Sequence, residues 1–130
     1  MNGLHLIADL HDCRCAPRFL LDAPGLEAFC VTACTRHGLT VVGRLFHPFR
    51  DARGRPAGVT GTVVLAESHL AVHTWPEVAG VTLDVYVCNF SGDNSARAQA
   101  LFTEVVAAFA PGRLQKKEVA RGHLAPPPRA

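Results

Sequence analysis

Apolar and polar residues alternate at the start of the chain and then change to a helical spacing. Residues 4–11 alternate regularly, which predicts a β-strand with one buried face. Asp22 and Pro24 then supply a helix cap and a first-turn proline, and apolar residues follow at helical spacing until Gly38. Residues 40–46 are β-branched and apolar, so they predict a second strand.

The middle of the chain predicts further strands joined by a loop. Prolines and glycines recur between residues 47 and 58, which predicts that this segment is a loop. Residues 59–66 and 70–75 are mostly apolar and predict either a pair of strands or one bent strand. Residues 81–90 alternate cleanly, and the alternation places Cys88 on the more polar face of its strand.

The end of the chain predicts a second helix and a last strand. A capped helix is expected to begin at Asn94 or Ser95 and to end at Pro111, and a short strand is expected at residues 114–119. The proline-rich residues 123–130 are expected to form a disordered tail. Two helices among five or six strands predict an α+β fold. It would be a two-layer sandwich of a mostly antiparallel β-sheet with both helices packed on one face.

Length and composition exclude several classes of function. A chain of 130 residues, 48% of them hydrophobic, can bury one core, so residues 1–122 are expected to form a single domain. The formal net charge is +2 and the basic residues are scattered, which argues against a nucleic-acid partner. The first residues lack a basic segment and an unbroken apolar run, so we expect no signal peptide, no membrane span and a cytoplasmic location. Five cysteines in no framework spacing are expected to be thiols.

Three polar residues, Glu67, Ser68 and His69, interrupt the apolar sequence between residues 63 and 75. A buried polar group without a partner costs free energy, so the interruption is either a solvated strand edge or a site of chemistry. His69 and His73 have the spacing of a zinc helix, but the segment is predicted to be a strand and lacks the catalytic glutamate. We therefore predict no metal, with histidines hydrogen-bonded at a sheet edge instead. A serine hydrolase is disfavoured because no Gly-x-Ser-x-Gly turn surrounds Ser68.

A third chemistry uses the same residues for cleavage of the chain by itself. A serine can attack the carbonyl of the residue before it, which would exchange the amide between Glu67 and Ser68 for an ester. Elimination of that ester by a base, such as a neutral histidine, would leave a dehydroalanine that hydrolyses to a pyruvoyl group. A pyruvoyl ketone forms a Schiff base with a substrate amine and draws electrons from the bond to a departing carboxylate.

The segment ESHLAVHTWPE, residues 67–77, resembles the cleavage-site motif of the small prokaryotic S-adenosylmethionine decarboxylases. Three other segments resemble the same family: GLHLIADLHDC its opening strand, LFHPF its Phe-His loop, and LDVYVC the strand that carries its cysteine. The resemblance runs from about Gly3 to Gly122. It implies a self-processing enzyme that converts S-adenosylmethionine to decarboxylated S-adenosylmethionine and carbon dioxide for spermidine biosynthesis. It also implies a homodimer of cleaved protomers with pockets near the subunit interface.

The resemblance implies five processing and catalytic residues. Ser68 would become the pyruvoyl group, after cleavage of the bond that joins it to Glu67. His73 would assist processing as the base in the elimination, and Thr60 would polarise the attacked carbonyl. Cys88 would return a proton to the substrate after carbon dioxide leaves. Cleavage would divide the protein into a β chain of residues 1–67 and an α chain of residues 68–130.

The resemblance also implies four residues that would bind S-adenosylmethionine. Glu77 would accept hydrogen bonds from the ribose hydroxyls, which suits a carboxylate. Phe49 would stack on the adenine, while Leu70 and Trp75 would help to shape the pocket. Cys13, Cys15, Cys30 and Cys34 are interpreted as structural.

Departures from the family pattern leave the substrate open between two classes. Residues 78–80 read Val-Ala-Gly where many family members have Tyr-Gly-Tyr, and Asn89 replaces a frequent glycine. The loop after Phe49 carries Arg50, Arg53 and Arg55, which we expect to face water. Relatives with altered pockets are thought to decarboxylate ornithine or arginine, so a pyruvoyl-dependent decarboxylase of either amino acid is the first alternative. A homologue that does not process itself and acts as a regulatory subunit is the second.

Overall fold

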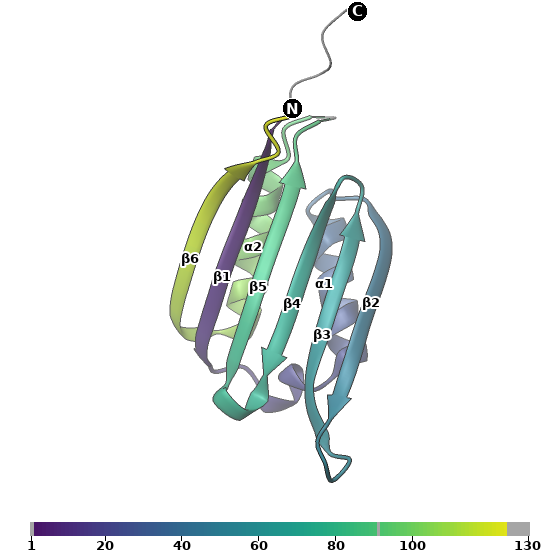
Figure 1. Ribbon diagram of the computed structural model, residues 1–130, viewed down its shortest axis with the longest axis vertical. Coiled ribbons are helices and arrows are strands. Elements are labelled where there is room, and N and C mark those ends of the chain that lie inside the picture. The colour runs from purple at the N-terminus through teal and green to yellow at the C-terminus, as the bar shows by residue number, and fades with distance from the viewer. Residues whose placement is uncertain (1, 91, 125–130) are drawn as a thin grey trace, which may run out of the picture.

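One antiparallel sheet and two α-helices make up residues 2–90 and 92–124, which the computed structural model describes (Figure 1). The sheet has the order β2-β3-β4-β5-β1-β6, and all neighbouring strands are antiparallel. Its strands are β1 (Gly3–Cys13), β2 (Val41–Arg50), β3 (Pro56–Leu65), β4 (Ser68–Trp75), β5 (Gly80–Cys88) and β6 (Pro111–Arg121). The helices are α1 (Ala23–Arg36) and α2 (Ser95–Phe109), with short 3-10 turns at Pro17–Leu20 (η1) and Pro76–Val78 (η2).

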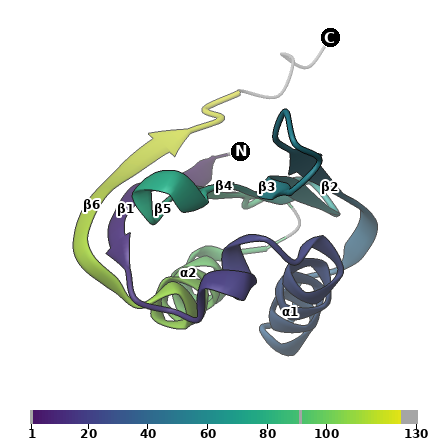
Figure 2. The same ribbon diagram turned by 90° about the horizontal axis from the view of Figure 1, so that it is seen from below.

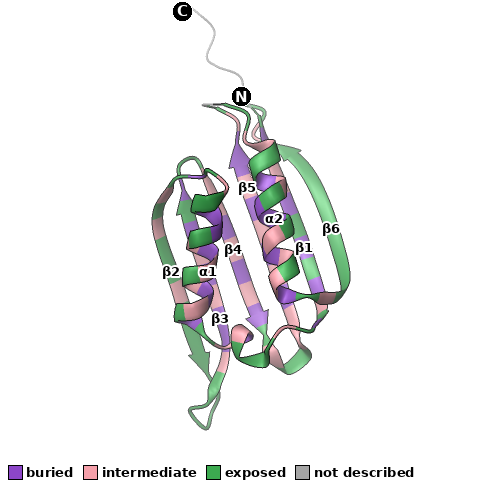
Figure 3. Cartoon of the chain, turned by 180° about the vertical axis from the view of Figure 1, so that it is seen from behind, coloured by how far each residue is buried: buried purple, intermediate pink, exposed green. Residues whose placement is uncertain are grey.

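Both α-helices lie against the same face of the sheet, as Figure 2 shows from below. The predicted α+β sandwich is therefore confirmed. Seen from behind, the buried residues lie between the helices and the central strands (Figure 3). Leu6 of β1, Leu70 of β4 and Val85 of β5 are fully buried there, together with Leu26 of α1 and Phe109 of α2. None of the described helices lies over the second face of the sheet, and the polar side chains of this face come from the alternate positions of the same strands.

The starts of the helices agree with the sequence prediction. Asp22 caps α1 and accepts a hydrogen bond from the backbone N–H of Gly25 over 3.0 Å. Asn94 precedes α2 at its N-cap position. The side chain of Asp93 accepts a hydrogen bond of 2.9 Å from the backbone N–H of Ser95, which satisfies one of the free donors at this helix end.

The loop predicted at residues 47–58 is much shorter than expected. Strand β2 continues to Arg50 and β3 begins at Pro56, so only residues 51–55 join them. Pro48 fits within β2 because this is an edge strand, where a missing N–H donor is tolerated.

The last strand is longer than predicted for a related reason. Strand β6 pairs with β1 from Pro111 onwards, although its own residues are mostly exposed and show little periodicity.

The two residues between β3 and β4 decide between the two alternatives predicted for this segment, a pair of strands or one bent strand. Leu65 pairs with Ser68, so Ala66 and Glu67 form a tight hairpin turn and the strand-pair prediction is confirmed. Most of the predicted disordered tail, residues 125–130, lies outside the described residues. Within the described part, no helix is long and apolar enough to cross a membrane.

Candidate active site

The predicted cleavage site lies in the tight turn between β3 and β4. Glu67 has a φ of 64°, in the left-handed region that a residue with a side chain rarely adopts. This backbone conformation costs free energy, and it occurs directly before the peptide bond that self-cleavage would break. The turn is held in place by a 2.9 Å hydrogen bond from the backbone N–H of Ala66 to the carbonyl of Thr40.

Ser68 and Cys88 lie next to each other where β4 begins and β5 ends. The backbone N–H of Cys88 donates a hydrogen bond of 3.2 Å to Oγ of Ser68. The carbonyl of Cys88 accepts a hydrogen bond of 3.2 Å from the side-chain amide of Asn94, so the peptide groups on both sides of the cysteine are fixed. Cys88 is 9% exposed. The structure therefore brings the predicted pyruvoyl precursor next to the backbone of the predicted proton donor.

Asn89, where the family frequently has glycine, connects the end of β5 to the start of α2. Its side-chain oxygen accepts a 2.9 Å hydrogen bond from the backbone N–H of Asn94, and its backbone N–H donates to the carbonyl of Asn2. These bonds give the asparagine a structural role next to Cys88. This departure from the family pattern supports the strand end that carries the cysteine.

Thr60 and His73 form a second pair, on β3 and β4. They are direct partners in the antiparallel register, and Oγ1 of Thr60 lies 3.0 Å from Nδ1 of His73. His73 is five residues from Ser68 on the same strand, which corresponds to about 16 Å along β4. An odd number of steps also places the two side chains on opposite faces. Within one chain, the predicted base therefore lies far from the serine.

The residues predicted to bind substrate lie mainly at this far end of the sheet. Phe49 is near the end of β2, Trp75 is the last residue of β4, and Glu77 is exposed in η2. The rings of His73 and Trp75 lie 5.9 Å apart, so the pair of Thr60 and His73 is continuous with this group. The predicted pocket residue Leu70 is fully buried in the hydrophobic core, where its side chain supports the sheet from the helix side.

The arginine-rich loop makes its hydrogen bonds within itself. Arg55 pairs with Asp51 over 3.0 Å, and Arg50 donates to the carbonyl of Gly54 over 2.9 Å. The pKa of Asp51 is lowered, first because its carboxylate accepts a backbone hydrogen bond from Arg55. Both arginine side chains therefore have structural partners in an exposed loop, in keeping with the predicted solvated loop.

Comparison with known proteins adds independent evidence for the predicted family. The family model described as S-adenosylmethionine decarboxylase matches residues 4–122. The chain belongs to the S-adenosylmethionine decarboxylase family. A relative from Syntrophomonas wolfei, named S-adenosylmethionine decarboxylase proenzyme, is 36% identical over 96% of this chain and 90% of its own length. A proenzyme of the same name from Methanococcus maripaludis is 32% identical over 92% of this chain and 89% of its own length.

A solved structure shows that this family shares the fold. The crystal structure of the adenosylmethionine decarboxylase from Aquifex aeolicus matches with a TM-score of 0.80 and 27% identity, over 98% of this chain and 97% of that one. The comparisons confirm the family predicted from the sequence. They also bear out the predicted enzyme class, a decarboxylase of S-adenosylmethionine.

Four cysteines outside the site have surroundings that suit a structural role. All five described cysteines are free thiols. Burial raises the pKa of Cys34 to about 12, and burial followed by the neighbouring Cys34 raises that of Cys30 to about 12. Burial is also the main cause that raises the pKa of Cys13 to about 11 and increases the pKa of Cys15. A thiol with a raised pKa is a poor nucleophile at neutral pH, so these four side chains act as small apolar groups.

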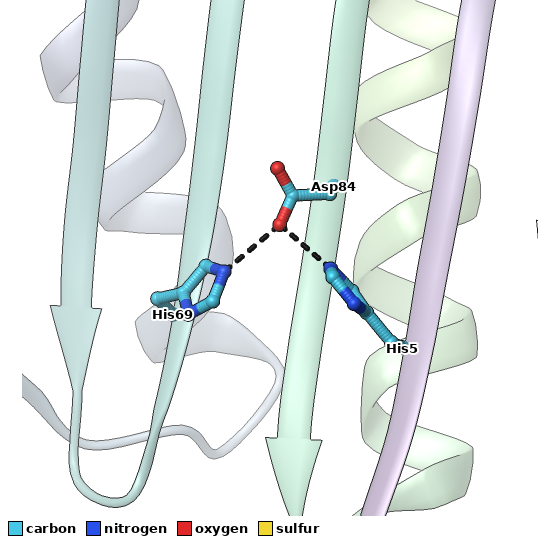
Figure 4. A group of neighbouring side chains, drawn as sticks. All are labelled: His5, His69 and Asp84. Carbon is cyan, nitrogen blue, oxygen red and sulfur yellow. Dashed lines mark hydrogen bonds and ion pairs between the residues drawn. The ribbon is translucent and has the colours of Figure 1, made fainter. Parts of the chain in front are cut away.

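A cluster of two histidines and a carboxylate next to Ser68 was missed in the sequence. His5 of β1 and His69 of β4 both contact Asp84 of β5 (Figure 4). The sequence contained a signal for this cluster, because each of the three residues occupies a polar position in a strand whose apolar and polar residues alternate. Finding the cluster also required the order of the strands, since His69 is 64 positions after His5 along the chain. These contacts belong to the uncovered face of the sheet.

Proposed function

We propose that this chain is a self-processing, pyruvoyl-dependent S-adenosylmethionine decarboxylase. It cuts its own backbone between Glu67 and Ser68, giving a β chain of residues 1–67 and an α chain of residues 68–130. The observation that carries the proposal is the left-handed backbone of Glu67 immediately before Ser68, whose Oγ is held by the N–H of Cys88. The word proenzyme in the names of the relatives supports it. The product would be the aminopropyl donor for spermidine biosynthesis.

The residues around this turn fit the formation of a pyruvoyl group. The strained conformation at Glu67 raises the energy of the uncut chain, and Oγ of Ser68 uses a lone pair to accept from Cys88, which leaves its own proton free to depart. When formed, the group supplies a ketone that acts as an electron sink for decarboxylation. The thiol of Cys88 then holds the proton that replaces the lost carboxylate.

The catalytic groups of one chain are divided between the two ends of its sheet. Ser68 and Cys88 are at one end, whereas Thr60, His73 and the predicted binding residue Glu77 are at the other. A two-fold axis parallel to the sheet and perpendicular to its strands would stack the uncovered faces of two copies and place one end of a chain over the opposite end of the other. We infer a homodimer in which Thr60 and His73 of each chain serve Ser68 of the other, with Glu77 and Phe49 completing the pocket.

The uncovered face of the sheet has the composition that such a dimer requires. Ile7 of β1, Val64 of β3 and Trp75 of β4 are each about two-fifths exposed, at positions that alternate with buried residues of the same strands. Association would remove these apolar side chains from water.

The free thiols support a reducing compartment, and a cytoplasmic location stays a prediction.

The family and the carboxylate of Glu77 favour S-adenosylmethionine over ornithine or arginine as the substrate. Glu77 is exposed and can accept two hydrogen bonds from neighbouring ribose hydroxyls. Neither amino acid carries a ribose, so neither would use this carboxylate in the same way.

The intact mass of the freshly purified, denatured protein tests the proposed function. We expect two fragments that meet between Glu67 and Ser68, with the second carrying a pyruvoyl group in place of the serine. The Ser68→Ala variant lacks the attacking hydroxyl and should stay uncut and inactive. A wild-type chain that stays uncut on incubation would contradict self-processing and would support the regulatory homologue.

A further inference from the structure

Asp84 joins two histidines from neighbouring strands on the uncovered face of the sheet. Its Oδ2 atom lies 2.9 Å from Nε2 of His5 and 2.8 Å from Nε2 of His69 (Figure 4). An ionised carboxylate only accepts hydrogen bonds, so both Nε2 atoms carry a hydrogen and donate it. The side chains are partly exposed, with values of 16% for His5, 27% for Asp84 and 36% for His69.

The second nitrogen of His5 explains why this cluster is a hydrogen-bond network. Nη1 of Arg121 lies 3.1 Å from Nδ1 of His5. A guanidinium is always a donor, so Nδ1 of His5 carries a lone pair and the hydrogen of the neutral ring is on Nε2. The three nitrogen and oxygen atoms lie within 4.8 Å of one another, a spacing that could hold a metal ion. With its hydrogen on Nε2, however, His5 has no lone pair there for a metal, so the arrangement favours hydrogen bonding.

His69 differs from His5 because its second nitrogen has no partner among residues 2–90 and 92–124. With Nε2–H directed at Asp84, neutral His69 has a lone pair on Nδ1, at the edge of the ring away from Asp84 in Figure 4. This is the arrangement in which a carboxylate fixes the tautomer of an imidazole base and stabilises its protonated form.

The side chain of His69 lies on the same face as that of Cys88, because its register partner Tyr86 is two residues before Cys88. In the uncut strand, Oγ of Ser68 lies on the opposite face. Once the bond to Glu67 is cut, position 68 is a chain end and is no longer held to one face by the strand on both sides.

We propose that His69 is a proton-transfer residue of the decarboxylase and that Asp84 is its positioning residue. The proposal rests on the function proposed above. An amino-acid substrate arrives with a protonated amine, which must lose one proton before its nitrogen can act as a nucleophile at position 68. That N–H bond breaks and Nδ1 of His69 gains the proton. The positive charge thereby moves from the substrate to an imidazolium that is hydrogen-bonded to the carboxylate of Asp84.

Two substitutions separate the base from the residue that positions it. His69→Gln keeps an N–H donor near Asp84 but removes the base, so kcat/KM should fall about 100-fold while cleavage at Ser68 continues. Asp84→Asn keeps His69 but replaces an acceptor-only carboxylate by an amide that also donates, so the tautomer of His69 is no longer fixed. His11→Gln is the matched control, because His11 is on the same sheet and, within the described part of the chain, its side chain bonds only to Gln115. It should change neither cleavage nor turnover.

The tautomer of His69 provides a readout that does not depend on turnover. We would record two-bond ¹H–¹⁵N spectra of the imidazoles at neutral pH in the full-length Ser68→Ala protein. His5 and His69 should both carry their hydrogen on Nε2, and Asp84→Asn should remove this preference at His69. A hydrogen on Nδ1 of His69 in the parent protein would overturn the proposal. So would tight Zn²⁺ binding that Asp84→Asn abolishes, because it would make the cluster a metal site.

Failure of this inference can be distinguished from failure of the proposed function. If the wild-type chain cuts itself and decarboxylates S-adenosylmethionine, but His69→Gln does so at an unchanged rate, only the role of His69 is wrong. If the wild-type chain stays uncut and inactive, the proposed function is wrong and the catalytic role of His69 falls with it. The spectra then report only whether Asp84 fixes the tautomer.

Discussion

Ser68 and His73 occupy one strand but lie at its two ends, with side chains on opposite faces of the sheet. His73 is five positions after Ser68, which is about 16 Å of extended chain. Oγ of Ser68 is paired with the backbone of Cys88, whereas Nδ1 of His73 is paired with Thr60. A base cannot take a proton over such a distance. If both residues take part in processing, they must come from different copies of the chain.

This relationship predicts complementation between two inactive variants. Ser68→Ala and His73→Ala should each stay largely uncut when expressed alone. In a mixed dimer, the intact Ser68 of one chain meets the intact His73 of the other, so one of the two sites is complete. Random pairing would give mixed dimers half of the time, and about a quarter of all sites should be restored. Intact mass and carbon dioxide release after co-expression would measure the recovery.

The control for complementation uses two variants that damage the same half of the site. Co-expression of Ser68→Ala with Cys88→Ala should restore no carbon dioxide release in a mixed dimer, because both residues act at the same end of one chain. Carbon dioxide release is the readout here, since the Cys88→Ala chain is expected to cut itself. Equal recovery in the two mixtures would contradict the division of the site between chains. Full cleavage of His73→Ala alone would show that His73 is not the base.

Cys88→Ala should separate cleavage from turnover. The hydrogen bond to Ser68 comes from the backbone N–H of Cys88, which the substitution leaves in place, so the chain should still cut itself. Loss of the thiol should lower kcat about 100-fold, because a positioned proton donor is removed. Mass spectrometry and carbon dioxide release would measure the two effects in one preparation. Normal turnover would remove Cys88 from the mechanism.

The sequence alone was sufficient for most of the fold because its alternation is strong wherever one strand face is buried. The cap at Asp22 and the alternation before Cys88 both predict elements that the structure contains. The edge strands β2 and β6 were predicted too short, since an edge strand is half solvated and tolerates proline and charge. Their pairing is decided by neighbours that local sequence does not reveal.

The candidate site was only partly predictable from sequence for a related reason. The motif from Glu67 to Glu77 supplied most of the residues, but its linear order suggested one compact group. A β-strand rises about 3.3 Å per residue, so the part of the motif that forms β4 (Ser68–Trp75) runs the length of the sheet and separates its two ends. The cluster around Asp84 depends on pairing between β1, β4 and β5, which only the strand order establishes.

Stability should decrease at alkaline pH because of two buried thiols. Burial raises the pKa of Cys30 and Cys34 to about 12, so the folded protein keeps protons that the unfolded chain releases above about pH 9. Their contribution is complete below that pH and is lost as the pH rises towards 12. In this window, each thiol lowers the free energy of unfolding by about 1 kcal/mol per pH unit. We would measure the free energy of unfolding in urea as a function of pH, for the Ser68→Ala protein and for the same protein with Cys30→Ala and Cys34→Ala added. The protein that keeps both thiols should lose stability more steeply as the pH rises. The same pH dependence in both proteins would contradict the prediction.

The backbone strain at Glu67 predicts a difference between glycine and alanine at this position. Glycine adopts a φ of 64° without the steric cost that a Cβ atom brings, and both substitutions remove the same carboxylate. In the uncut Ser68→Ala background, the Glu67→Gly protein should be more stable than Glu67→Ala by about 1 kcal/mol. In the chain that retains Ser68, the glycine variant should cut itself more slowly, because less strain is released. Equal cleavage rates would show that strain does not drive the reaction.

Glu77 should determine affinity for the nucleoside part of the substrate without affecting cleavage. Replacing it by glutamine weakens two charge-assisted hydrogen bonds to the ribose, so KM for S-adenosylmethionine should rise about 10-fold to 100-fold, with kcat largely kept. Glu118→Gln is a suitable control, because Glu118 is also exposed but belongs to the edge strand β6. Steady-state rates with S-adenosylmethionine, ornithine and arginine would check this directly. An unchanged KM together with turnover of ornithine or arginine would move the substrate to the amino-acid class, while leaving the self-cleavage chemistry in place.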